Sequence, residues 1–194
     1  ANEAVIVDIL SVTNGTESGT QQQTTNITDD DTAGFTITES GGSTSVNESG
    51  TTDTFTVVLN SQPLTDVVIT VMSGDMGEAT VAQATLTFTF ANWNVAQTVT
   101  VTGVNDPSVD GNQLTTVTLA IDDANSDDAF DAVANQTVTV TTVDDDTPGF
   151  TIAESGGGTS VNESGTTHTF TGVLNSQLPA DGVITVTRGD KREA

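Results

Sequence analysis

The sequence predicts an all-β chain made of antiparallel β-sandwich repeats arranged in tandem. Short runs alternate apolar and polar residues, and no segment of helical length shows a 3.6-residue period. In addition, one phrase returns: "NITDDDTAGFTITES" begins at Asn26 and "TTVDDDTPGFTIAES" at Thr141, so that Asp29 and Asp144 lie 115 residues apart. Fixed spacing of this kind is the sequence signature of a repeat architecture.

The expected strands follow one another from residue 34 onward. They lie in the runs TDTFTVVLN, ATLTFTF, QTVTVTGV, LTTVTLAID and QTVTVTTV. Each run is rich in β-branched residues and is bounded by Gly, Asn, Asp or Ser, which is typical of half-buried antiparallel strands. The second run should place Leu86, Phe88 and Phe90 on one face. About seven or eight such strands fit between Gly34 and Thr147, which is the number expected of an immunoglobulin-like sandwich.

The repeat divides the chain into three expected parts. Residues 34–148 should form one complete sandwich. Residues 149–194 match residues 34–79, including "SVNESGTT" and "VLNSQ", and should be the N-terminal part of a following repeat. Residues 1–33 should be the C-terminal part of a preceding repeat. A piece cut from a longer tandem array is the simpler interpretation, and a sandwich completed by strand exchange between chains is the alternative.

The charge of the chain excludes several classes of partner. The sequence carries 27 acidic residues and three basic ones, giving a formal net charge of −24. Duplex nucleic acids are bound largely through Lys and Arg, so a nucleic-acid partner is not expected. No stretch has the length of a membrane span. The absence of Cys excludes disulfides and thiolate metal sites.

The acidic run Asp144 to Asp146 predicts a bound cation. Two unit charges 4 Å apart repel by roughly 4 kcal/mol at an effective dielectric near 20. A few such pairs rival the roughly 5 to 15 kcal/mol that stabilises a domain. No Lys or Arg lies nearby in the sequence. Carboxylate, amide and carbonyl oxygens favour Ca²⁺ over Zn²⁺ or Cu²⁺.

The candidate ligands share positions where strands are expected to end. Loops at one end of a sandwich converge even when they are far apart in sequence, so these residues can share one site. A site at that end would also link the domain to the next one. In the complete repeat the candidates are Glu48, Asp75, Asp106, Asp110, Asp144, Asp145 and Asp146, and in the partial repeats they are Asp29, Asp30, Asp31 and Glu163.

The motifs "VNESG", "SGD", "VTVTGVNDPSVDG" and "VDDDT" together resemble the Calx-beta repeat. That repeat occurs in the calcium-binding loops of sodium/calcium exchangers and in tandem arrays of large bacterial surface and adhesion proteins. The resemblance covers the complete repeat and both partial ones. It implies Ca²⁺ ligation by Glu48, Asp75, Asp106, Asp110 and Asp144 to Asp146. The chain departs from the family pattern at Asn105, where Asp is common, and at Gln113, where Glu is common.

Other acidic signals have simpler explanations. "DPSVDG" from Asp106 resembles the start of an EF-hand loop, but the twelfth position is Val117, so we reject that interpretation. The segment Asp122 to Asp131 is either another calcium loop or a solvated excursion, with Phe130 attaching it to the core.

Three further residues or motifs are expected to have no catalytic or recognition role. Arg188 to Asp190 spell "RGD", which we interpret as a chance match. His168 should be exposed on a polar strand face and not part of a catalytic triad. Trp93 should form a corner of the sandwich.

The sequence as a whole favours a non-enzymatic, calcium-binding structural repeat of an extracellular or cell-surface protein, an adhesin or a filament. Its expected partners are neighbouring repeats or subunits of the same type. One alternative is an adhesion module that binds a glycan or protein on a host or matrix surface. Another is a filament subunit joined by strand exchange. A glycosidase is not expected, because the carboxylates recur in every repeat without an aromatic cleft.

Overall fold

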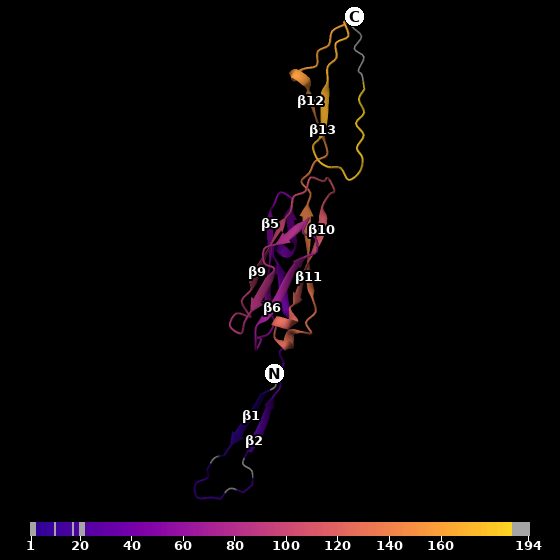
Figure 1. The fold of residues 1–194 in the computed structure, drawn as a ribbon. Helices are drawn as coiled ribbons and strands as arrows, with labels where there is room; N and C mark the ends of the chain where they lie inside the picture. Colours follow the sequence, from indigo (N-terminus) through magenta and orange to yellow (C-terminus); the bar gives the residue numbers. More distant parts are fainter. Residues whose placement is uncertain (1–2, 10, 17, 20–21, 188–194) are drawn as a thin grey trace.

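A computed structural model describes residues 3–9, 11–16, 18–19 and 22–187. The chain is elongated, with three parts placed end to end (Figure 1). An N-terminal hairpin comes first, formed by β1 (Glu3–Asp8) and β2 (Gln22–Ile27). The central part is a β-sandwich, and an open C-terminal part follows, with β12 (Phe150–Glu154) and β13 (Phe170–Leu174).

Two sheets form the sandwich. The five-stranded sheet has the order β4-β11-β10-β6-β8, where β4 is Thr44–Asn47, β11 is Gln136–Val143, β10 is Gln113–Ile121, β6 is Val67–Ser73 and β8 is Thr85–Phe88. The four-stranded sheet has the order β3-β5-β9-β7, where β3 is Phe35–Glu39, β5 is Thr52–Leu59, β9 is Gln97–Gly103 and β7 is Ala79–Val81. The pair β4–β11 is parallel and the other pairs are antiparallel.

The predicted all-β sandwich is therefore confirmed. The described strands of the sandwich number nine rather than seven or eight, since the short strands β4 and β7 are added to the longer runs. Four short 3₁₀ helices complete the described elements: η1 (Ser40–Gly42), η2 (Asp123–Asn125), η3 (Asp128–Phe130) and η4 (Ser155–Gly157). Among the described residues, no helix has the length and hydropathy needed to span a membrane.

The core lies between the two sheets and follows the period-two pattern. Phe55, Val57 and Leu59 of β5 face inward, as the alternation in TDTFTVVLN requires, with at most 3% of each exposed. They pack in one buried cluster with the inward-facing residues of the opposite sheet, among them Val117 and Leu119. Burial of this apolar surface is the main force that holds the sheets together.

The prediction for Phe90 is wrong. The strand β8 ends at Phe88, and Phe90 is 60% exposed. The side chain of Asn92 accepts a hydrogen bond from the Thr89 N–H at 2.5 Å, which turns the backbone away from the sheet. Period-two alternation continues in the sequence past the point where a side-chain hydrogen bond ends the strand.

Trp93 and Phe130 take the places predicted for them. Trp93 lies in the turn between β8 and β9, is partly buried against the core, and its carbonyl accepts the Leu59 N–H. Phe130 ends η3 and is 1% exposed, so it attaches the segment between β10 and β11 to the core.

The C-terminal part repeats the pairing of the sandwich in an open form. Phe150 pairs with Leu174 as Phe35 pairs with Leu59, at the offset of 115 residues. Phe150 is 49% exposed whereas Phe35 is 3% exposed, because no second sheet covers β12 and β13 in the described part of the chain. The division of the protein into repeats at residues 34 and 149 stays a prediction.

Candidate metal centre

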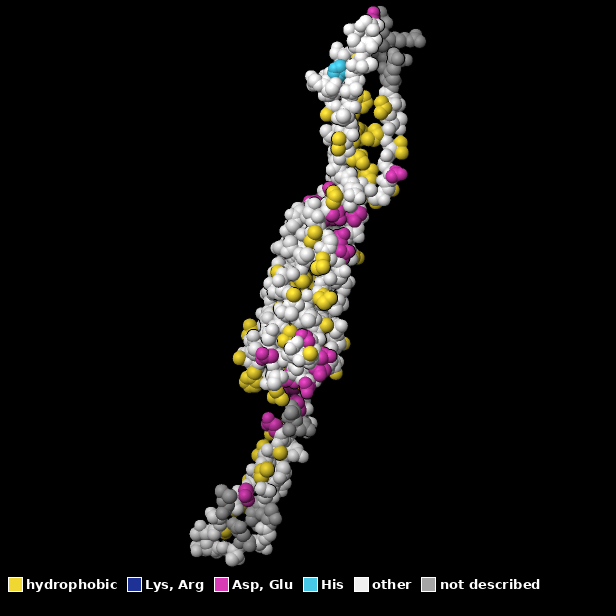
Figure 2. Space-filling view, in the orientation of Figure 1, with side chains coloured by type: hydrophobic (Ala, Val, Ile, Leu, Met, Phe, Trp, Pro, Cys, Tyr) yellow, Lys and Arg dark blue, Asp and Glu magenta, His cyan; other side chains and the backbone are white. Residues whose placement is uncertain are grey.

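Acidic side chains gather at both ends of the central sandwich (Figure 2). At the end next to the C-terminal part, two groups bring three carboxylates together. Within each group, one oxygen of every member lies within 4.8 Å of the others. The first group is Glu48, Asp144 and Asp146, and the second is Glu78, Asp106 and Asp110.

The parallel pair of strands positions Glu48. It follows directly on β4, and its N–H donates to the Val143 carbonyl at 3.1 Å, at the end of β11. This pairing places its side chain next to the acidic run that begins at Asp144. Glu48 is only 1% exposed, and both of its carboxylate oxygens are buried without a hydrogen-bond partner.

The surroundings of Glu48 oppose its ionisation when no cation is bound. Burial first, then the charges of Asp144, Asp106 and Asp110, raise the pKa of Glu48 to about 7. The nearby backbone N–H of Asp145 offsets part of this rise in pKa, although it does not form a hydrogen bond with the carboxylate. A buried carboxylate without a donor is costly unless a cation neutralises it.

Glu78 occupies the corresponding place in the second group. It lies just before β7, in the loop that follows β6, and one of its carboxylate oxygens is buried without a partner. Burial, followed by the charges of Asp110, Asp106 and Asp75, raises its pKa above the ordinary value. The charges of one loop, which carries Asp106 and Asp110, therefore raise the pKa of both Glu48 and Glu78.

Hydrogen bonds connect this loop to the acidic run. Gly111, whose φ of 76° favours glycine, donates its N–H to Asp144 Oδ2 at 2.8 Å. The Asp146 N–H donates to Asp144 Oδ1 at 2.8 Å. The Gln113 side-chain amide donates to the carbonyls of Asp110 and Gly111 at 3.2 Å. Gln113 thus holds the loop through its side-chain amide.

The donor set suits a hard divalent cation. The two groups supply six carboxylates, and four of their oxygens are buried without a partner: both of Glu48, one of Glu78 and Oδ2 of Asp146. All three basic residues of the chain lie at positions 188–192. Oxygen ligands in an irregular arrangement fit Ca²⁺ better than Mg²⁺, which demands a near-ideal octahedron.

The structure brings together five of the predicted ligands and leaves the others apart. Glu48, Asp106, Asp110, Asp144 and Asp146 lie in the two groups. Asp75 and Asp145 are exposed and belong to neither, and Asp75 Oδ1 accepts the Gly77 N–H at 2.8 Å. The predicted ligands of the partial repeats are also exposed and belong to neither group found among the described residues: Asp29, Asp30, Asp31 and Glu163.

Glu78 was not predicted as a ligand. In "SGDMGEA" the sequence favoured Asp75, which follows the strand β6 more closely. In the structure Glu78 immediately precedes the short strand β7, so that its backbone is fixed by the sheet. That strand was too short to be recognised from alternation alone.

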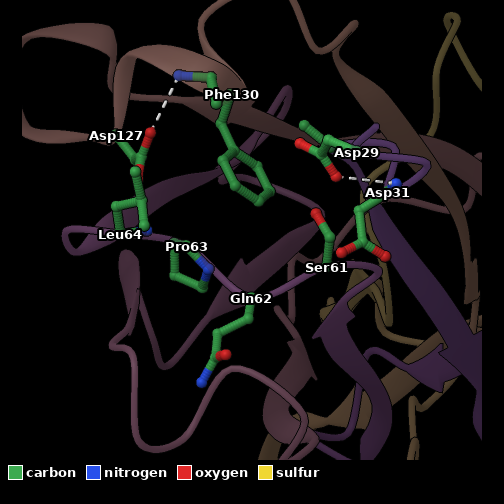
Figure 3. Close-up of a pocket in the computed structure, with 10 residues that line it drawn as sticks. Asp29, Asp31, Ser61, Gln62, Pro63, Leu64, Asp127 and Phe130 are labelled. Atoms are coloured by element: carbon green, nitrogen blue, oxygen red, sulfur yellow. Dashed lines mark hydrogen bonds between the residues drawn. The ribbon is translucent and has the colours of Figure 1, made fainter. Parts of the chain in front are cut away.

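The opposite end of the sandwich holds a pocket of about 250 Å³ (Figure 3). Asp29, Asp31, Ser61, Asp127 and Phe130 are among the residues that line it. Asp29 Oδ1 accepts the Asp31 N–H at 3.1 Å. This acidic run lies 115 residues before the run at residues 144–146.

Asp127 is buried at this end of the sandwich, and backbone donors partner its carboxylate. Its carboxylate accepts the N–H groups of Leu64 at 2.6 Å, Thr65 at 3.0 Å and Ala129 at 3.0 Å. Burial alone would raise the pKa of Asp127, but these three donors hold it below the ordinary value. The segment Asp122 to Asp131 is thus a largely exposed excursion attached to the core through Asp127 and Phe130, and no metal-type group is found in it among the described residues.

The remaining signals agree with the simpler interpretations where the structure describes them. His168 is exposed, as predicted, but it precedes β13 and does not lie on a strand; its Nδ1 is 3.0 Å from Ser155 Oγ. Val117, the twelfth position of the rejected EF-hand, is buried in β10. The RGD motif at residues 188–190 lies outside the described residues.

No protein-family model and no curated protein matches the chain. Solved structures with similar folds include SSP-19, an MSP-domain protein like family member of Caenorhabditis elegans, at 18% identity and a TM-score of 0.37, covering 55% of this chain and 97% of that one. The apo-form Calx CBD1 domain shows 16% identity and a TM-score of 0.41, covering 58% and 98%. Domains 4 and 5 of the S-layer protein SbsC show 21% identity and a TM-score of 0.39, covering 66% and 61%.

Proposed function

We propose that this chain is a calcium-binding structural repeat of an extracellular surface, adhesin or filament protein, in which Ca²⁺ stiffens the junctions between repeats. The observation that carries the proposal is Glu48, whose two carboxylate oxygens are buried and unpartnered beside Asp144 and Asp146. Such a group is stable when a cation supplies the missing interactions.

Calcium would act on this chain through thermodynamic linkage. An ion that binds only the folded state stabilises it by about 2.7 kcal/mol when its concentration is 100 times its Kd. The groups lie where the sandwich meets the next part of the chain, so the same ion also restricts bending there. In this view the concentration of calcium around the protein sets both its stability and its rigidity.

The test combines thermal unfolding with small-angle scattering, each with calcium and with a chelator. Calcium is expected to raise the Tm and to narrow the distribution of shapes. Glu48→Gln should weaken both responses, because it removes the buried charge. The matched control is Glu163→Gln, one period later at an exposed position, which should respond like the unmodified chain. A Tm and scattering profile that ignore calcium would refute the proposal.

A second candidate function is a filament subunit joined by strand exchange. It is favoured by apolar side chains that are exposed outside the sandwich, such as Val7 on β1 at 60% and Phe170 on β13 at 50%. Exposed apolar faces of this kind mark interaction sites. Sedimentation at increasing concentration distinguishes the two candidates, since strand exchange requires polymers and a repeat within a longer chain does not.

A further inference from the structure

A short segment of the C-terminal part, Ser176 and Gln177, contacts both acidic elements of the candidate metal centre. Ser176 Oγ lies 3.1 Å from Asp146 Oδ1 and 3.1 Å from the Thr147 carbonyl, and can donate to either. Asp146 belongs to the first acidic group, and its other oxygen is buried and unpartnered. When its hydroxyl donates to Oδ1, Ser176 holds the Asp146 carboxylate in the orientation seen here.

Gln177 holds the second acidic element through its backbone. Its N–H donates to the Pro107 carbonyl at 2.6 Å, and its carbonyl accepts the Val109 N–H at 2.9 Å. Ser108 pairs with Gln177 in a parallel bridge. These contacts lie between Asp106 and Asp110, the two ligands that the loop contributes to the second group.

We propose that Ser176 and Gln177 are positioning residues of the metal centre, so that the calcium affinity of one repeat depends on its contact with the next. This inference rests on the calcium-binding function proposed above. The complete repeat supplies the carboxylates, and its neighbour holds two of the elements that carry them. By thermodynamic reciprocity, calcium bound to the centre strengthens the contact between the two repeats by the same factor.

The chain contains its own control for this inference. Ser61 and Gln62 occupy the same place one period earlier, within the same "VLNSQ" sequence. They lie at the opposite end of the sandwich, where Ser61 lines the pocket with Asp29 and the Gln62 side chain donates to the Phe90 carbonyl. A substitution at Ser61 or Gln62 thus changes the same residue types without touching the metal centre.

The experiment is calorimetric titration of the full chain with calcium chloride. Ser176→Ala removes the hydroxyl donor, and Gln177→Pro removes the backbone donor. Partners that orient metal ligands are worth about 10- to 100-fold in metal affinity, so each variant is expected to bind calcium about 10-fold more weakly or worse. Ser61→Ala and Gln62→Pro should bind it like the unmodified chain.

Small-angle scattering of the same variants in chelator gives a second readout that needs no metal. Gln177→Pro should broaden the distribution of angles between the sandwich and the C-terminal part, and Gln62→Pro should leave this distribution unchanged. Equal calcium affinity in the Ser176 and Gln177 variants would overturn this inference and leave the proposed function standing. Equal losses in the control variants would overturn it as well. A chain that binds no calcium at all would overturn both proposals.

Discussion

Glu48 shows how a single side chain connects stability to metal binding. It is the largest buried acidic residue of the described chain, and its carboxylate faces two other carboxylates instead of donors. In the absence of a cation, ionising this carboxylate destabilises the folded state, which is why the pKa of Glu48 is raised from 4.5 to about 7. The sequence marked Glu48 through its repeat in "VNESG", but its burial followed only from the fold.

The raised pKa of Glu48 predicts an unusual pH dependence of the calcium-free chain. Between about 4.5 and about 7, the folded state keeps a proton that the unfolded state has released. The contribution of Glu48 to the free energy of unfolding is therefore largest below 4.5 and falls as the pH rises toward 7. Urea unfolding in chelator across this range should show the decrease, and Glu48→Gln should remove it.

Calcium should reverse the direction of that dependence. The ion binds the ionised carboxylate, so its affinity should increase as the pH rises through the pKa of Glu48. Calcium titrations at pH values on either side of about 7 check this. An affinity that does not change with pH in this range would mean that Glu48 is not a ligand.

Unlike Glu48, Asp127 has a buried carboxylate that accepts hydrogen bonds from three backbone N–H groups. Asp127→Asn replaces one acceptor oxygen by a donor that faces other N–H groups, and is expected to cost about 1 to 3 kcal/mol of stability. The control is Asp128→Asn, an exposed neighbour. Since the pKa of Asp127 is lowered, its contribution is present above the ordinary Asp pKa and is lost as the pH falls through the folded value. Denaturant unfolding near neutral pH and in acid measures both effects.

The strand β9 lies against the backbone next to the metal centre through Gly103. A Cβ at this position would lie 2.2 Å from the Asn47 carbonyl oxygen, a backbone atom next to Glu48. The two chain segments can approach in this way only because Gly103 has no side chain. Neither alternation nor turn signals in the sequence predicted this contact, since it joins strands of different sheets.

Gly103→Ala should therefore destabilise the sandwich and disturb the centre together. Forcing a methyl group into a packed contact costs about 1 to 3 kcal/mol. Displacement of Asn47 would also move Glu48, so the rise in Tm with calcium should shrink. Gly172→Ala in β13 is the control, because nothing lies within 4 Å of its added Cβ. If Gly103→Ala keeps the full calcium response, the approach of β9 does not position Glu48.

The sequence predicted the elements of this fold better than their ends. The alternating runs identified β5, β9, β10 and β11, because their inward faces are buried over the whole strand. It failed at Phe90, where the Asn92 side chain ends β8, and at β7, which has only three residues. The same limit explains Glu78, whose position depends on β7. Asp144 follows β11, a strand that the pattern showed, whereas Glu48 follows the short strand β4 and was marked only by its repeat in "VNESG".

The net charge of −24 makes the entire chain sensitive to its ionic surroundings. In chelator, sodium chloride should raise the Tm, because the screening length falls from about 30 Å at 0.01 M to about 3 Å at 1 M. Calcium chloride at a few millimolar should raise it further than sodium chloride of equal ionic strength. Magnesium chloride should lie between them, since Mg²⁺ fits an irregular site poorly. Identical Tm values in the three salts at equal ionic strength would mean that screening alone explains the rise in Tm.

The parallel pairing of β4 with β11 also determines how the molecule responds to tension. The chain enters the sandwich at one end and leaves it at the other (Figure 1), and β4 and β11 lie side by side from Thr44 with Val140 to Asn47 with Val143. A pull along the long axis slides these two strands past each other, so their hydrogen bonds are loaded together and must break together. An antiparallel pair pulled from one end opens one bond at a time. We therefore expect the sandwich to resist stretching along its own length.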